Sequence, residues 1–161
     1  MEQFQTAGEQ AKKCIKVADH MLIMAFPLVK DPKILLSVTE NIFSALSNSM
    51  SSLVYYERLF KRVPVFQEDF DSKFNIFKQY LVEKYSIRRE YLNLIQEIRE
   101  ILAEHKKSPV EFSRGDRFVI CSSNYRLKTI GVPELKRYIA QTKMFMSDME
   151  RLVNKNAGIF K

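Results

Sequence analysis

An arginine and a histidine, Arg99 and His105, stand six residues apart in a stretch with helical spacing. Histidine exchanges protons near neutral pH, so His105 could act as acid or base on an RNA 2′-hydroxyl or leaving group. Arginine stabilises charge that builds on a phosphate, and such cleavage requires no metal. On a straight helix the offset separates the two side chains by about 120° and about 9 Å along the axis. They therefore share a site only if the helix ends early or if two subunits each contribute.

Basic side chains and aromatic rings alternate in the stretch that follows His105. Lysine and arginine neutralise phosphates and exposed aromatic rings stack on bases, so residues 105–128 are a candidate nucleic-acid-binding segment. In the alternative interpretation, Phe112 and Phe118 pack on the helices and the basic side chains are only solvated. His105 is then the basic residue that a helix C-terminus favours. The candidate phosphate contacts are Lys106, Lys107, Arg114, Arg117, Arg126 and Lys128.

The excess positive charge lies in the second part of the chain. Residues 1–60 contain six basic and six acidic residues, whereas residues 61–161 contain 20 and 13, which accounts for the whole net charge of +7. Such an excess predicts an anionic partner. That partner is RNA or a nucleotide in one interpretation and an acidic protein surface in the other.

Length and composition indicate one cytoplasmic domain, residues 1–161. A hydrophobic content of 46% is sufficient for a core. Two cysteines, Cys14 and Cys121, cannot form a disulfide framework and indicate reduced thiols. The chain begins without a signal-peptide pattern, and its longest apolar stretch, residues 21–29, is too short to span a bilayer. We therefore expect no membrane partner.

Apolar residues recur every three or four positions in five segments, while glycine and proline are few. This pattern predicts an all-α fold, a single bundle of about five helices whose first two are long and antiparallel. Pro27 is expected to end the first helix, and Asp31 with Pro32 to begin the second. Ser86 is a candidate cap for the fourth helix. We place the helices at about 11–25, 31–62, 67–84, 86–105 and 133–154.

The helical period is lost between the fourth and fifth helices. Residues 106–116 show no sustained period. Two β-prone segments, 118–121 and 125–130, flank a turn-rich stretch at 122–124, which predicts a small β-hairpin near 117–130. An isolated hairpin is marginal in water, so this one is expected to pack on the bundle.

Small polar residues mark one side of the second predicted helix. They recur at intervals of three or four, and a helix side without charge is unusual for solvent. Small side chains allow another helix to approach closely, either within the bundle or across the two-fold axis of a homodimer; simple exposure is the alternative. These residues are Ser37, Asn41, Ser44, Asn48 and Ser52.

Several kinds of site have no signal in this sequence. It contains neither a glycine-rich phosphate loop nor a CxxC, HExxH or EF-hand pattern. Two cysteines and two histidines, widely separated, do not suit structural zinc. Cys14 lies on an apolar stripe and is interpreted as buried and structural. We therefore expect no metal and no cofactor.

The helix layout resembles the HEPN superfamily, all-helical domains of prokaryotic nucleotide-binding and RNA-cleaving systems. Many members carry an Arg-x(4–6)-His motif near a dimer interface, where it acts as a metal-independent ribonuclease site. The Arg99–His105 segment fits that spacing, and residues 125–130 followed by 132–153 resemble the family's ending. The resemblance implies a dimeric module with Arg99 and His105 as its ribonuclease pair. Glu100 departs from the Asn, Asp or His that usually follows the arginine.

Two functional hypotheses follow. In the first, a HEPN-like helical module binds RNA or a nucleotide through its basic C-terminal half and uses Arg99 and His105 for cleavage. In the second, a non-catalytic structural or adaptor protein docks a protein partner through its helical faces. Whether the protein is an enzyme stays open. A continuous positive groove beside Arg99 and His105 favours the first hypothesis, and basic residues spread around the bundle favour the second.

Overall fold

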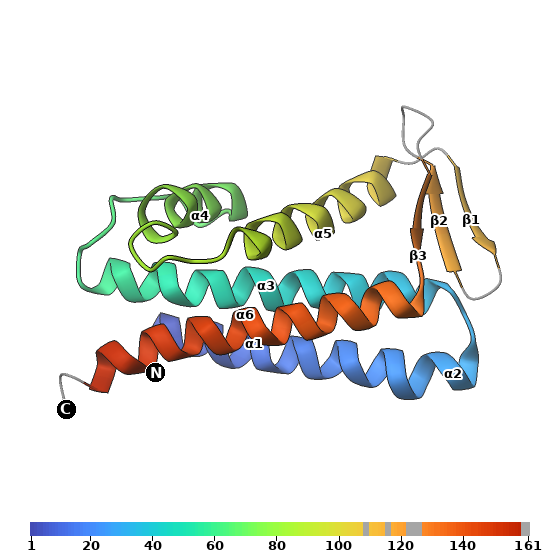
Figure 1. Ribbon diagram of the computed structural model, residues 1–161, viewed down its shortest axis with the longest axis horizontal. Coiled ribbons are helices and arrows are strands. Elements are labelled where there is room, and N and C mark those ends of the chain that lie inside the picture. Colours follow the sequence, from blue (N-terminus) through green and yellow to red (C-terminus); the bar gives the residue numbers. More distant parts are fainter. Residues whose placement is uncertain (108–109, 115–116, 122–126, 159–161) are drawn as a thin grey trace.

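The chain folds into an all-α bundle with a small antiparallel sheet at one end, as the sequence predicts (Figure 1). The central helix, α3 (Lys33–Leu59), packs against α1 (Gln3–His20) and α6 (Val132–Gly158), and α4 and α5 also lie on it. α1 and α3 run antiparallel, and the start of α1 and the end of α6 lie away from the sheet. The computed structural model describes the backbone of residues 1–107, 110–114, 117–121 and 127–158, and the side chains of 1–106, 117–120 and 128–154.

Pro27 does not end the first helix, which corrects the sequence prediction. α1 continues through a π-helical turn, η1 (Met21–Ala25), into the single turn of α2 (Phe26–Val29). The Phe26 N–H donates to the Met21 carbonyl across the π-turn, and Pro27 follows in the first turn of α2, where its missing N–H is tolerated. The helix ends at Lys30, whose φ of 55° is left-handed.

The second long helix begins as predicted and ends slightly earlier. The Asp31 carboxylate accepts a hydrogen bond of 3.0 Å from the Lys33 N–H, which satisfies one donor of the first turn. At the other end Lys61 takes a φ of 56°, and the Arg62 N–H donates to the Glu57 carbonyl at 3.0 Å. This left-handed closure stops the helix before Pro64.

Most of the small polar residues of α3 are half-buried. Ser52 is buried, and its Oγ donates to the Phe4 carbonyl of α1 at 2.7 Å. The Asn41 and Asn48 amides donate to carbonyls of α3 itself, one turn back. A Cβ added at Gly8 of α1 would lie 3.6 Å from Ser52 Oγ, which is ordinary contact. The small residues therefore permit close packing of α1 on α3 within one chain.

The third and fourth predicted helices are shorter than the sequence predicts. α4 (Phe70–Ile76) begins at Asp69, whose carboxylate accepts from the Ser72 N–H, and it continues as a π-turn, η2 (Phe77–Leu81). Ser86 does not cap the next helix, because it takes a left-handed φ of 51° and closes the preceding turn. α5 (Arg89–Lys107) begins three residues later.

The predicted hairpin is part of a three-stranded sheet with the order β1-β2-β3. β2 (Arg117–Cys121) and β3 (Leu127–Ile130) form the hairpin, and β1 (Val110–Arg114) adds a strand that the sequence did not predict. The predicted turn at 122–124 lies outside the described residues. β2 buries Phe118, Val119 and Ile120, and it contacts α3 and α5, so the sheet packs on the bundle as expected.

The core lies along α3, whose inward residues are fully buried from Leu35 to Tyr56. Aromatic side chains from several elements join it, including Phe77 of η2, which meets Phe145 of α6 edge-on with ring centroids 6.1 Å apart. Along the described chain, no helix has both the length and the apolar character needed to cross a membrane.

Candidate functional site

Arg99 is held by residues at the start of α4. Its guanidinium forms an ion pair with Asp71, with 2.5 Å between Nη1 and Oδ1. It also lies over the Phe70 ring, 5.0 Å from the ring centroid. Both contacts tie the outer side of α5 to α4. The side chain is about half exposed, so its charge is partly neutralised at the surface.

His105 contacts the sheet instead. Its ring meets the Phe118 ring of β2 edge-on, with centroids 6.2 Å apart and planes at 72°. The helix also continues past His105 to Lys107, so it does not end early enough to bring Arg99 and His105 together. Within the chain, Arg99 thus contacts α4 and His105 contacts β2. These two elements lie toward opposite ends of α5 (Figure 1). A shared site requires a second subunit.

Three of the predicted phosphate contacts have described side chains, and these three lie around the junction of α5, the sheet and α6. Lys106 is exposed at the end of α5, and Lys128 is half-buried on β3. Arg117 is exposed at the start of β2, where its Nη1 lies 3.8 Å from Glu134 of α6. Phe118, a candidate for base stacking, is buried, as the alternative interpretation of this stretch expects. The side chains of Lys107, Phe112, Arg114, Tyr125 and Arg126 lie outside the described residues.

Many other cations are paired with acids around the bundle. Lys12 of α1 bridges to Glu150 of α6 at 2.9 Å, and Lys143 of α6 bridges to Asp19 of α1 at 3.1 Å. Comparable pairs join Arg58 to Glu68, and Arg151 to Asp148. Several cations on different helices are therefore neutralised by acids of the same chain.

A buried carboxylate that the sequence analysis missed lies at the end of α3. Glu57 has no exposed surface, and it accepts hydrogen bonds from Arg62 at 2.5 Å, from Lys84 at 3.2 Å and from the Tyr85 hydroxyl. Burial alone would raise the pKa of this carboxyl, but the bonds from Tyr85, Arg62 and Lys84 together hold the pKa below its usual value. The signal in the sequence was an acidic residue directly after Tyr56, inside the apolar period of the second predicted helix. This cluster connects α3 to the segment after η2 and is structural.

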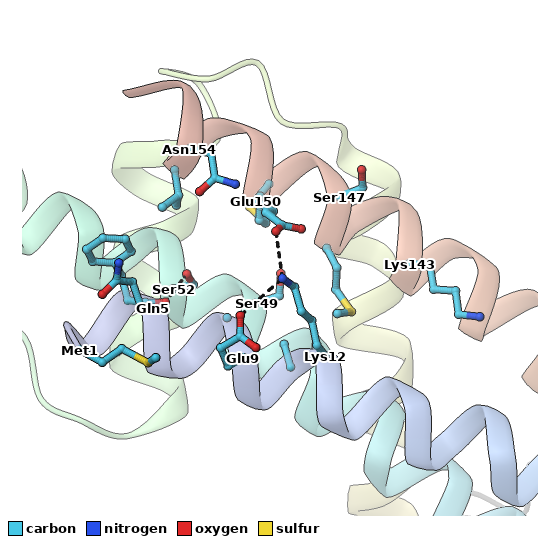
Figure 2. A pocket seen from close by; sticks show the side chains of 16 residues that line it. Met1, Gln5, Glu9, Lys12, Ser49, Ser52, Lys143, Ser147, Glu150 and Asn154 are labelled. Carbon is cyan, nitrogen blue, oxygen red and sulfur yellow. Dashed lines mark hydrogen bonds and ion pairs between the residues drawn. The ribbon is translucent and has the colours of Figure 1, made fainter. Parts of the chain in front are cut away.

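A groove of about 550 Å³ runs between the first part of α1 and the last part of α6, with α3 as its floor (Figure 2). Small residues line it, among them Gly8 of α1 and Ser49 and Ser52 of the α3 floor. Lys12 spans it, paired with Glu150 at 2.9 Å and with Glu9 at 3.5 Å. The hydrogen bonds to Glu150 and Glu9 raise the pKa of Lys12, so its ammonium group stays charged and paired within the chain. Glu9, Lys12 and Glu150 are thus paired with one another across the groove.

A second hollow of about 550 Å³ lies between α2 and the start of α6. Its two cations come from opposite sides, Lys30 from the end of α2 and Lys136 from α6. Neither lysine forms an ion pair with a described residue. Its apolar lining is Leu22, Ile23, Phe26, Pro27 and Val132.

The described residues contain no group of three His, Cys, Asp or Glu side chains arranged to hold a metal ion. Comparison with known proteins adds no relative. No family model matches the chain, and neither a curated protein nor a solved structure matches it significantly.

Proposed function

We propose that the protein is a non-catalytic helical adaptor that docks a protein partner. The observation that carries this proposal is the placement of the candidate catalytic pair. Arg99 is bound to Asp71 and Phe70 of α4, and His105 packs on Phe118 of β2. A general acid and a phosphate-stabilising cation must both reach one reacting group, and these contacts hold Arg99 and His105 toward opposite ends of α5.

The distribution of charge supports the same function. Cations paired with acids of the same chain are not free to bind a phosphate backbone, whereas nucleic-acid binding uses unpaired cations that follow the strand. The grooves beside α1 and α2 are apolar in large part, which suits side chains of a protein partner.

The test is an RNA cleavage assay with a matched pair of histidine variants. Wild-type protein, His105→Ala and His20→Ala would be incubated with a short single-stranded RNA and the products separated on a gel. His20 is the other histidine of the chain and lies at the end of α1. We expect no cleavage above background by any of the three. Cleavage by the wild type and by His20→Ala, lost in His105→Ala, would overturn the adaptor function.

A second candidate function is RNA or nucleotide binding at the sheet end of the bundle. It is favoured by the contact of His105 with Phe118, which brings the end of α5, with exposed Lys106, beside the strand that begins at Arg117. In its HEPN-like form a second subunit would complete the pair of Arg99 and His105, so this candidate also implies a homodimer.

Fluorescence anisotropy with the same RNA at two salt concentrations tests this candidate. Phosphate contacts predict micromolar or tighter binding that weakens steeply with salt, and further weakening in Lys106→Glu. Lys13→Glu is the control, because Lys13 is exposed on α1, a helix that packs on α3 and α6. Binding that is absent at low salt, or equal in both variants, would reject it.

A further inference from the structure

This inference rests on the adaptor function and names the docking surface and its partner. We propose that the α2 tip (Ile23, Met24, Pro27, Leu28 and Val29) and the hollow beside it bind an acidic amphipathic segment of a partner protein. In such a segment, bulky apolar side chains lie within one helical turn of Asp or Glu. The apolar side chain enters the hollow, and the carboxylates meet Lys30 and Lys136.

The α2 tip exposes an unusual amount of apolar surface. Leu28 is 84% exposed, Val29 64%, Met24 55% and Ile23 52%, all within seven consecutive residues. Exposed aliphatic residues that occur singly are normal, but a contiguous group of this kind marks an interaction site. The π-turn over 21–25 contributes to this exposure, because it lets the helix continue past Ala25 and carry the last apolar residues to the end of the bundle (Figure 1).

The hollow has the size and lining of a site for side chains. Its volume of about 550 Å³ lies within the range of pockets that hold compact ligands. The wall from α2 contains Phe26 and Pro27, and Val132 forms the opposite wall at the start of α6. One bulky aliphatic or aromatic side chain of the partner would fill only part of this space. Two side chains of the partner segment, one helical turn apart, therefore fit the hollow together.

Charge complementarity identifies the partner as acidic. Lys30 and Lys136 have no ion pair among the described residues, in contrast to Lys12 of α1 and Lys143 farther along α6. The backbone of Lys30 is fixed, because its N–H donates to the Phe26 carbonyl at 2.7 Å. Asp31, the adjacent acid, accepts from the Lys33 N–H at the start of α3. Two lysines without an acid partner beside an apolar hollow therefore favour carboxylates that flank an apolar side chain.

Other occupants fit this surface less well. Phe26 is the aromatic residue of the lining and is buried, so the hollow offers no exposed aromatic platform for bases, which single-stranded RNA uses. A second copy related by a two-fold axis would place Lys30 and Lys136 against the same lysines. Anionic membranes recruit longer amphipathic helices or clusters of four to eight cations, whereas α2 is a single turn.

Selection from a displayed library of random twelve-residue peptides tests the proposal. Immobilised wild-type protein would be the target, and a Leu28→Ser/Lys136→Glu double variant would serve for counter-selection. Both substituted side chains are exposed, so the variant is expected to keep the fold, which circular dichroism would verify. We expect the enriched peptides to carry Asp or Glu beside Leu, Ile or Phe.

The strongest enriched peptide would then be labelled and titrated by fluorescence anisotropy. We expect Leu28→Ser and Lys136→Glu each to weaken binding at least fivefold, and Val65→Ser and Lys13→Glu to leave it unchanged. Val65 is 98% exposed in the loop after α3, which makes it the matched apolar control. Enrichment without an acidic bias, equal binding to all variants, or failure to enrich any peptide would overturn the proposal.

Two further outcomes would assign the surface to another occupant. Sedimentation of vesicles containing phosphatidylserine with wild type, but not with Leu28→Ser, would assign it to lipid. A concentration-dependent dimer that Leu28→Ser abolishes would assign it to a second copy. Each of these overturns the inference while the adaptor function itself is judged separately, by the RNA cleavage assay.

Discussion

Glu57 is the residue on which the junction between α3 and η2 depends. A carboxylate without exposed surface requires partners for its charge, and it obtains them from three side chains on two segments of chain, Arg62, Lys84 and Tyr85. The favourable interactions outweigh the cost of burial, because the pKa of Glu57 lies below its usual value. An acid inside the bundle is thus a structural feature and not a sign of catalysis.

Replacement of this residue is expected to be costly at neutral pH. Glu57→Gln keeps the volume but removes the charge that Arg62 and Lys84 satisfy, so we expect a loss of about 2 to 4 kcal/mol in the free energy of unfolding. Urea unfolding at neutral pH measures this difference. Glu150→Gln is the control, because its ion pair with Lys12 is exposed and worth at most about 1 kcal/mol.

The same variant should change the acid dependence of stability. A carboxyl whose pKa is lowered in the folded state stabilises the fold above its unfolded pKa, and this contribution is lost as the pH falls through the lower, folded value. We therefore expect wild-type stability to fall below about pH 4.5 more steeply than that of Glu57→Gln. Parallel acid-unfolding curves for the two proteins would contradict this role.

Tyr138 is expected to make the stability of the fold decrease as the pH rises in the alkaline range, which is the opposite sign to Glu57. Burial, together with a hydrogen bond of 2.7 Å from its hydroxyl to Glu97, raises the pKa of Tyr138 to about 12. Its contribution is therefore complete below the ordinary tyrosine pKa of about 10 and is lost as the pH rises toward 12. Tyr138→Phe should flatten the stability curve in that window and cost about 1 kcal/mol at neutral pH. Tyr80→Phe, at an exposed site, should do neither in the same urea titrations.

At the scale of elements, periodicity predicted the helices well and their ends less well. The stripe of α3 and the Asp31 start are local features of the sequence, and the structure has both. Pro27 was misjudged because a π-turn, which no single residue announces, accommodates it. β1 was missed because its short segment has no period of its own and forms by pairing with β2, a tertiary effect.

Ser86 shows why such ends are difficult to predict. Serine is a common helix cap, but here it occupies a left-handed position between two helices, with a φ of 51°. Glycine adopts this conformation without the steric cost of a Cβ, so Ser86→Gly should raise the free energy of unfolding by about 0.5 to 1 kcal/mol. Thermal unfolding would measure the gain. Ser147→Gly, within α6, should instead lower stability by a similar amount, and the same sign for both variants would contradict the assignment.

For the molecule as a whole, the central position of α3 couples the stability of the elements that pack on it. α1, α4, α5, α6 and the sheet all contact this helix, so each buries part of its apolar surface on the same core. Composition indicated one domain and an anionic partner, but neither composition nor spacing revealed which cations are paired. The candidate pair of Arg99 and His105 satisfies a two-residue motif, whereas their separate contacts with α4 and β2 depend on how distant segments pack.

A cavity created in the core beside α3 should therefore lower the stability of all the elements together. Leu46 is fully buried near the middle of this helix, and Leu46→Ala removes its packing, which should cost about 3 to 5 kcal/mol. Because every other helix rests on α3, hydrogen exchange should accelerate by the same factor in α1 and in α5, and unfolding should stay a single transition. Leu59→Ala, near the exposed end of the same helix, should have a much smaller effect. Faster exchange confined to α1 and α3 would show that the α4–α5 half folds independently and that the chain contains two units.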